Sequence, residues 1–188
     1  MKSALMLGVN PQADRQKEDF YATNPKALNL FLEAFKEKLN EPVWEPSCGQ
    51  GHLAEELRKH GYDVLATDLV DRGYGTGGVN FFNVIADHPG DILTNPPFKC
   101  AENYVEKGMS VLEKGRKMFL FLKIQFLEGQ KRNELFKKYP PKYVYCHSSR
   151  QLCAKDGKFE KYTSTTQFYA WYVWEKGYYG DTIMKWIN

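Results

Sequence analysis

Hydrophobic and polar positions alternate along the chain with two different periods. In four segments the apolar residues lie three and four positions apart, as on the buried face of an amphipathic helix. These predicted helices cover residues 25–39, 53–60, 101–112 and 130–139. Pro25 suits the first turn of the first helix, and Gly61 directly follows the second helix, where glycine is favoured.

Seven shorter segments have the alternating or continuous apolar character of strands. They cover residues 42–46, 62–69, 79–84, 91–94, 117–127, 143–147 and 166–174. Strands that alternate with helices predict an α/β domain whose mostly parallel sheet has helices on both sides. Residues 148–164, between the last two strands, show no helical pattern. We therefore predict a doubly wound, mostly parallel seven-stranded sheet with a C-terminal antiparallel hairpin at one edge.

Size and composition narrow the class of protein. The 188 residues, 43% of them hydrophobic, fit one domain, with residues 1–41 as an N-terminal helical segment packed on it. No apolar run approaches the ~18–20 residues of a membrane helix, and residues 1–10 lack a signal-peptide pattern, so we expect a cytoplasmic protein. The four cysteines are scattered, and even Cys146, His147 and Cys153 have poor metal-ligand spacing, so we expect no metal.

Charge is unevenly distributed, although the net charge is only +3. Residues 1–98 contain 9 Lys or Arg and 14 Asp or Glu, whereas residues 99–161 contain 15 and 7. A basic half beside an acidic half favours a polyanionic partner. The competing interpretation is that these lysines cover a solvated helix face, which is common.

A first group of chemically informative residues follows the predicted strand 42–46. Gly49 and Gly51 form a turn before the next helix, where a ligand can approach the backbone and the helix N-terminus. Asp68 ends the following strand, the position at which doubly wound sheets present an acid to ribose hydroxyls. The third glycine of a dinucleotide-binding turn is absent, and glycine turns with strand-end acids also occur in α/β proteins without such a ligand.

A second group, Asn95-Pro96-Pro97-Phe98, follows the predicted strand 91–94 and carries the strongest functional signal. The two prolines stiffen the turn and lack N–H donors but keep their carbonyl acceptors. The Asn95 side-chain oxygen and the Pro96 carbonyl can accept the two hydrogens of an NH₂ group, and Phe98 can stack on the ring that bears it. The competing interpretation is a strand-ending turn that adds one phenylalanine to the core.

Together these motifs resemble class I S-adenosylmethionine-dependent methyltransferases of the N6-adenine type, similar to small solitary and bacteriophage DNA adenine methylases. Asn95-Pro96-Pro97-Phe98 matches the catalytic tetrapeptide of that family. The residues that the resemblance assigns to the cofactor are Glu45, Pro46, Gly49 and Gly51 in the glycine motif, Asp68 for the ribose, Tyr21 and Thr23 for the methionine end, Asn80 and Phe81 for the adenine, and Asn95. The motifs span residues 19–98, and the segments 126–132 and 170–174 also look like phage-type members.

The resemblance implies a Rossmann-like fold, S-adenosylmethionine as cofactor, and direct in-line methyl transfer to adenine N6 of a flipped DNA base, in the cytoplasm of a bacterium or a phage-infected cell. Asn95 and the Pro96 carbonyl would hold the amine, and Phe98 would stack on the base. The basic half would then contact phosphates. The candidates are Lys131, Arg132, Lys137 and Lys138 in the predicted helix 130–139, and Arg150, Lys155, Lys158 and Lys161 in the edge hairpin.

Other functions share parts of this pattern. The tetrapeptide also occurs in proteins resembling RNA adenine or guanine methyltransferases and in enzymes that methylate a glutamine amide, and the fold can serve as a non-catalytic nucleic-acid-binding module. DNA is favoured because the chain shows no RNA-binding module and its late segments look phage-like, while residues 1–24 are too short for the extra domain of the glutamine enzymes. We expect no separate target-recognition domain and no obligate protein partner, so the target sequence is not predicted.

Overall fold

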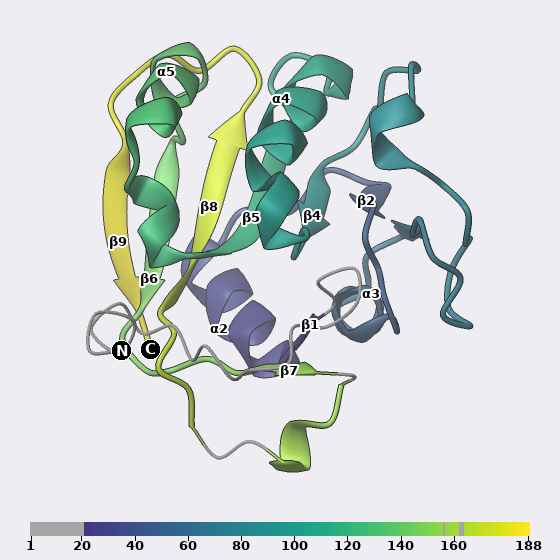
Figure 1. The fold of residues 1–188 in the computed structure, drawn as a ribbon. Helices are drawn as coiled ribbons and strands as arrows, with labels where there is room; N and C mark the ends of the chain where they lie inside the picture. The colour runs from purple at the N-terminus through teal and green to yellow at the C-terminus, as the bar shows by residue number, and fades with distance from the viewer. Residues whose placement is uncertain (1–20, 156, 162–163) are drawn as a thin grey trace.

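The computed structural model describes residues 21–155, 157–161 and 164–188, except the side chain of Lys155 (Figure 1). Its α-helices match the predicted helical segments to within a few residues. They are α2 (Pro25–Phe35), α3 (His52–Lys59), α4 (Ala101–Val111) and α5 (Gln130–Lys138). No helix within the described ranges combines the length and the apolar character needed to cross a bilayer.

A seven-stranded sheet forms the centre of the fold, with the strand order β3-β2-β4-β5-β8-β6-β9. Its strands are β2 (Val43–Glu45), β3 (Val64–Ala66), β4 (Ile92–Thr94), β5 (Lys117–Lys123), β6 (Tyr143–His147), β8 (Tyr169–Glu175) and β9 (Ile183–Ile187). The pairs β2–β3, β2–β4, β4–β5 and β6–β9 are parallel. Only β8 runs antiparallel to its neighbours, β5 and β6. The sheet is therefore mostly parallel, as the sequence predicted.

Helices cover both faces of the sheet, and the side chains of β5 show why. Phe119 and Phe121 point into the core formed with α2 and α3, whereas Met118, Leu120 and Leu122 point into the core formed with α4 and α5. All five are essentially inaccessible to solvent. A strand buried on both faces needs apolar residues at every position, which explains the uninterrupted apolar run in the sequence. Figure 1 shows α4 and α5 side by side on one of these faces.

One predicted strand is not formed. Residues 79–84 are instead a loop with a single 3₁₀ turn, Phe81–Asn83. The Asn80 side chain begins this turn, because its Oδ1 accepts the Phe82 N–H at 3.0 Å. Asparagine favours turns by bonding the backbone two residues further on, and this local bond prevailed over the strand-forming character of the valine and phenylalanine residues.

The sheet still has seven strands, because β9, which the sequence did not predict, adds one where residues 79–84 do not. β9 pairs with the outer side of β6 and forms the edge of the sheet. The antiparallel pair β6–β8 therefore lies inside the sheet, and the hairpin expected at the edge is covered by β9. Ile183, Met184 and Trp186 on this strand are all exposed, so the segment lacks the alternation between buried and exposed positions by which a strand is recognised.

A second, two-stranded sheet joins distant parts of the chain. β1 (Tyr21–Thr23) pairs antiparallel with β7 (Cys153–Lys155), with Ala22 opposite Ala154. The Asn24 N–H extends the pairing by donating to the Leu152 carbonyl at 3.0 Å. This small sheet holds residues 21–23 in contact with Asn95, directly after β4.

Candidate active site

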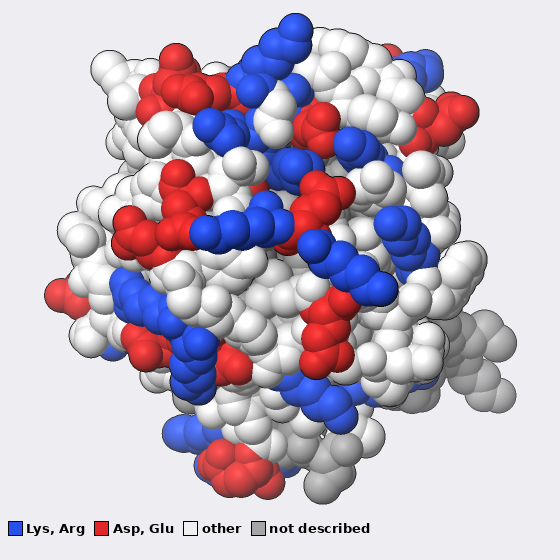
Figure 2. Space-filling model, turned by 180° about the vertical axis from the view of Figure 1, so that it is seen from behind, with Lys and Arg blue, Asp and Glu red and all other residues white. Residues whose placement is uncertain are grey.

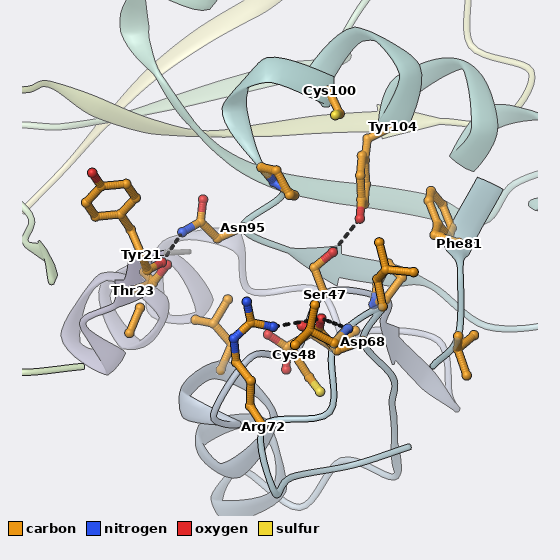
Figure 3. Close-up of a pocket in the computed structure, with 18 of the residues that line it drawn as sticks. Tyr21, Thr23, Ser47, Cys48, Asp68, Arg72, Phe81, Asn95, Cys100 and Tyr104 are labelled. Atoms are coloured by element: carbon orange, nitrogen blue, oxygen red, sulfur yellow. Dashed lines mark hydrogen bonds and ion pairs between the residues drawn. The ribbon is translucent and has the colours of Figure 1, made fainter. Parts of the chain in front are cut away.

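The parallel strands β2, β3 and β4 end at the same edge of the sheet, and a cleft opens there, as is usual for ligand sites in open α/β sheets. Its empty volume, including the open solvent at its mouth, is about 880 Å³. The lining comes from β1, from the loops after β2, β3 and β4, and from α3 and α4 (Figure 3). It includes Tyr21, Thr23, Glu45, Pro46, Ser47, Cys48, His52, Asp68, Leu69, Arg72, Asn80, Phe81, Phe82, Asn95, Pro97, Cys100 and Tyr104.

Asn95 directly follows β4, and its side-chain amide has a defined orientation. Nδ2 donates to the Tyr21 carbonyl at 2.9 Å (Figure 3). Oδ1 is buried and has no hydrogen-bond donor among the described residues. Leaving a buried acceptor unsatisfied costs about 1–3 kcal/mol. An unsatisfied group of this kind marks Asn95 as a candidate for contact with a ligand.

The two prolines that follow differ in the use of their carbonyls. The Pro97 carbonyl accepts the Cys100 N–H at 2.9 Å and so begins the 3₁₀ turn Phe98–Cys100. No described backbone N–H donates to the Pro96 carbonyl. Pro96 itself is buried and lines neither this cleft nor the hollow that Phe98 lines, so the role of its carbonyl as the second acceptor for an NH₂ group stays a prediction.

Phe98 lies on the far side of this turn. It does not line the cleft but a second hollow, together with Leu122, Lys123, Gln125, Phe126 and Arg132. The Lys123 ammonium lies 5.0 Å from the centroid of the Phe98 ring. The segment from Asn95 to Phe98 thus borders two hollows, and the predicted stacking of Phe98 on a target ring would take place in the second one.

Two buried acids lie at the carboxyl ends of adjacent strands: Glu45 is the last residue of β2, and Asp68 follows β3. Burial raises the pKa of Glu45 well above its usual value, and the nearby Asp68 carboxylate acts in the same direction. Glu45 Oε2 has no hydrogen-bond partner among the described residues. Asp68 accepts the backbone N–H groups of Gly49 and Val70, each at 2.8 Å, and pairs with the Arg72 guanidinium at 3.2 Å. Asp68 therefore fastens the turn after β2 to the loop after β3.

The two glycines of the motif shape this turn through contacts within the protein. Gly49 and Gly51 both have positive φ, +56° and +85°. A Cβ at Gly51 would overlap the ring of Tyr74, which packs over the turn. Neither glycine lines the cleft, whereas Pro46 from the same turn does. The structure thus accounts for Gly51 by the close approach of Tyr74, and a contact with a cofactor stays a prediction for both glycines.

Asn80 and Phe81 both line the cleft. Phe81, however, exposes little of the ring surface that packing against an adenine would need. The Phe81 ring is only 2% exposed, because it stacks on Tyr104 with centroids 4.8 Å apart. The neighbouring Phe82 is 38% exposed and also lines the cleft. An adenine placed here would find most of its apolar contact on Phe82 and Leu69, with Phe81 supporting from behind.

Several lining residues were missed by the sequence analysis. The Ser47 and Tyr104 hydroxyls are hydrogen-bonded to each other across the cleft (Figure 3), and burial raises the pKa of Tyr104 to about 12. Tyr104 lies on the apolar face of α4, where its sequence position predicts only core packing. Arg72 lies in a loop without a motif. Only the fold brings these side chains to the cleft.

The residues predicted to contact nucleic acid lie in two places, on α5 and in the segment between β6 and β8. On α5, Arg132 pairs with Glu102, Lys137 with Glu134 and Lys138 with Glu106, while Lys131 is exposed. Arg150 stacks on Phe168 at 3.5 Å, and Lys158 and Lys161 are exposed. The side chain of Lys155 lies outside the described part of the chain. Figure 2 shows a face on which basic and acidic side chains are interspersed, so this face has no continuous basic surface.

Comparisons with known proteins identify the fold. No family model matches the chain, and no curated protein matches it in sequence. Among solved structures, a presumed class I S-adenosylmethionine-dependent methyltransferase from Listeria monocytogenes superposes with a TM-score of 0.62 at 15% identity, covering 93% of this chain and 68% of that one. The modification subunit of a presumed type I restriction enzyme from Vibrio vulnificus gives 0.61 at 15% identity, covering 91% and 46%.

A presumed hemolysin from Lactococcus lactis is similar to the same degree, with a TM-score of 0.61 at 12% identity, covering 86% of this chain and 91% of that one. At these identities the superpositions establish the fold, which is that of the class I methyltransferases. The chain spans less than half of the restriction-enzyme subunit. Since one fold supports several functions, the function must be argued from the residues of the cleft.

Proposed function

We propose that the protein transfers a methyl group from S-adenosylmethionine to an exocyclic amine, with adenine N6 in DNA as the substrate. The observation that carries this proposal is the orientation of Asn95. Its Nδ2 is bound to the Tyr21 carbonyl, which leaves the buried Oδ1 as an acceptor without a described donor. An amine with two hydrogens is the donor that Oδ1 and the nearby Pro96 carbonyl would share.

The residues of the cleft fit the proposed cofactor. Asp68 can accept from ribose hydroxyls, and Glu45 Oε2, buried without a described partner, can accept from an amino group. Leu69 and Phe82 supply exposed apolar surface for an adenine. When bound, S-adenosylmethionine supplies an electrophilic methyl group on its sulfonium sulfur.

The residues of the chain would act by positioning. The lone pair of an exocyclic amine is delocalised into its ring, which makes the nitrogen a poor nucleophile. Hydrogen bonds from its protons to Asn95 Oδ1 and the Pro96 carbonyl favour a pyramidal nitrogen with its lone pair localised. No base of low pKa is then required, because the proton can leave after transfer. Positioning of this kind supplies about 7–11 kcal/mol in favourable cases.

The choice of DNA rests on the phage-type character of segments 126–132 and 170–174 and on the lack of a recognisable RNA-binding module in the sequence, because the tetrapeptide itself is shared with RNA methyltransferases. The modification subunit of a type I restriction enzyme is among the proteins with a similar fold. A base in a duplex must leave the stack to reach a cleft, at a few kcal/mol. Phe98, in the second hollow beside the Asn95 turn, would restore stacking worth about 1–3 kcal/mol.

The decisive experiment is incubation of the protein with methyl-labelled S-adenosylmethionine and separate pools of DNA, RNA and protein, followed by nucleoside analysis of the labelled product. Label in N6-methyl-2′-deoxyadenosine from DNA supports the proposal. Label in RNA or protein would reassign the substrate. Binding of the cofactor without any transfer would favour a non-catalytic module, and Asn95→Ala run in parallel separates enzymatic transfer from background labelling.

A further inference from the structure

Asp68 and Arg72 form an ion pair inside the cleft. Arg72 Nη1 lies 3.2 Å from Asp68 Oδ1, and the two side chains are 17% and 11% exposed. Both residues line the cleft, and Figure 3 shows the guanidinium reaching across to the carboxylate. This arginine matters because, in the proposed function, Asp68 is also the acid that accepts hydrogen bonds from the ribose hydroxyls.

The acceptor capacity of the Asp68 carboxylate is nearly filled by the protein. An ionised carboxylate offers about four lone-pair positions. Oδ1 accepts the Val70 N–H and the Arg72 guanidinium, and Oδ2 accepts the Gly49 N–H. These three bonds leave one position, whereas a ribose presents two hydroxyl donors. A ribose diol can bind Asp68 through both hydroxyls only if one existing donor leaves.

We propose that this donor is Arg72: a ribose bound in the cleft displaces the guanidinium from Asp68, so that Arg72 lowers the affinity of the cleft for nucleoside ligands. The inference rests on the proposed function, since it takes the ligand to be an adenosine derivative. The N–H groups of Gly49 and Val70 belong to the backbone turns that form the cleft, and their removal would reshape it. Arg72 is a long side chain on a loop, so its guanidinium can leave Asp68 without any change in the backbone turns of the cleft.

This mechanism makes Arg72 a positioning residue that acts through Asp68. In the ligand-free protein it occupies the acceptor position on Asp68 Oδ1 that one hydroxyl of the diol would take. On binding, the pair between two largely buried groups is exchanged for hydroxyl bonds. The effect depends on the two hydroxyls of the ligand, which distinguishes it from any general change in the shape of the cleft.

The test is calorimetric binding of two probes, S-adenosylhomocysteine and its 2′,3′-dideoxy analogue, to the wild-type chain, Arg72→Gln, Arg72→Lys and the control Arg116→Gln. Arg116 also faces an acid, Glu113, but does not line the cleft. We expect Arg72→Gln to bind S-adenosylhomocysteine about fivefold more tightly, which corresponds to ~1 kcal/mol. Its affinity for the dideoxy analogue should be unchanged. Arg72→Lys should fall between wild type and Arg72→Gln, and Arg116→Gln should alter neither affinity.

Equal shifts for both probes, or an unchanged or weakened affinity of Arg72→Gln for S-adenosylhomocysteine, would overturn the displacement of Arg72 while leaving the proposed function intact. A wild-type chain that binds neither probe would overturn both. If Arg72→Gln does not fold, Arg72→Lys decides the question, because a lysine at this position donates fewer and less directed hydrogen bonds. Its affinity for S-adenosylhomocysteine must then exceed that of the wild type, with no gain for the dideoxy analogue.

Discussion

The side-chain amide of Asn95 is held by the main chain of Tyr21, with Nδ2 donating to the Tyr21 carbonyl at 2.9 Å. Because an amide has one donor end and one acceptor end, this bond leaves Oδ1 as a buried acceptor without a described donor. β1, which carries Tyr21, is itself paired with β7. A two-stranded sheet built from distant segments therefore sets the orientation of the acceptor in the cleft.

Replacing Asn95 by alanine should lower turnover far more than cofactor affinity. The variant loses the Oδ1 acceptor for the amine but keeps the walls of the cleft. We expect turnover to fall on the order of 100-fold, the usual loss when one polar group of a preorganised site is removed. The dissociation constant of S-adenosylmethionine should change by less than about threefold. Single-turnover methylation and calorimetry measure the two quantities, and Asn29→Ala on α2, away from the cleft, is the control. Unchanged turnover would remove Asn95 from the mechanism.

Cofactor binding should release protons from Glu45. Burial raises the pKa of this carboxyl well above its usual value, so it retains its proton to a higher pH than an exposed glutamate. A cationic amino group bound beside it favours the carboxylate and expels the proton. Calorimetry in two buffers with different ionisation enthalpies should therefore give different apparent binding enthalpies. Glu45→Gln should abolish the difference, and equal enthalpies for the wild-type chain would contradict the role of Glu45.

Gly51→Ala should destabilise the protein more than Gly61→Ala. Both glycines have a φ of +85°, so the backbone strain added by a Cβ, roughly 1–2 kcal/mol, is common to the two variants. A Cβ at Gly51 meets the Tyr74 ring, whereas a Cβ at Gly61 meets nothing within 4 Å. We expect Gly51→Ala to lower the unfolding free energy by about 1–3 kcal/mol more, the usual range for overpacking. Urea denaturation measures both, and equal losses would show that Tyr74 yields without strain.

Gly49 and Gly51 also show which features of the site can be predicted from the sequence and which cannot. The glycine turn, the strand that precedes it and Asp68 were all predictable, because local conformation and strand-end position depend on residues close in the chain. The contact that Gly51 accommodates comes from Tyr74, 23 positions further on. A motif therefore predicts that a glycine is needed, while the group that approaches it is known only from the fold.

The same distinction explains the errors in the sheet. β5 was predicted because burial on both faces leaves a continuous apolar run. Residues 79–84 were predicted as a strand on similar grounds, but the Asn80 side chain stabilises a turn there. β9 was missed because its exposed residues carry no alternation and its pairing with β6 is a tertiary property. Likewise, Arg72 and Tyr104 reach the cleft only through the arrangement of α4 and the loop after β3.

Binding to DNA should depend on Arg150 and Lys158 more than on the paired lysines of α5. Within the described part of the chain no carboxylate forms an ion pair with either residue, whereas Lys137 and Lys138 have acidic partners in Glu134 and Glu106. The double variant Arg150→Gln/Lys158→Gln should bind an oligonucleotide more weakly. The slope of log affinity against log salt should become shallower by about 0.9 for each phosphate that the variant no longer neutralises. The control Lys137→Gln/Lys138→Gln should leave the slope nearly unchanged, and the reverse pattern would place the DNA on α5.

The stability of the protein should decrease between pH 6.5 and 4 because of His147. Burial lowers the pKa of His147 from 6.5 to about 4, and neither ring nitrogen has a hydrogen-bond partner among the described residues. The folded state therefore keeps this ring neutral, while the unfolded state binds a proton once the pH falls below 6.5. The contribution of the neutral ring to the unfolding free energy is fully present above that pH and is lost as the pH approaches 4. Over this interval the unfolding free energy falls by about 1.4 kcal/mol for each pH unit.

His147→Phe removes the titrating group while keeping a ring of similar size beside Phe121, whose centroid lies 5.9 Å from that of His147. The variant should gain stability relative to the wild type as the pH is lowered, by roughly 3 kcal/mol between about pH 7 and pH 4. Other buried histidines and acids titrate in both proteins, so the informative quantity is the difference in unfolding free energy between them at each pH. Urea denaturation at several pH values gives this difference. A difference that stays constant would show that His147 is protonated equally in the folded and unfolded states.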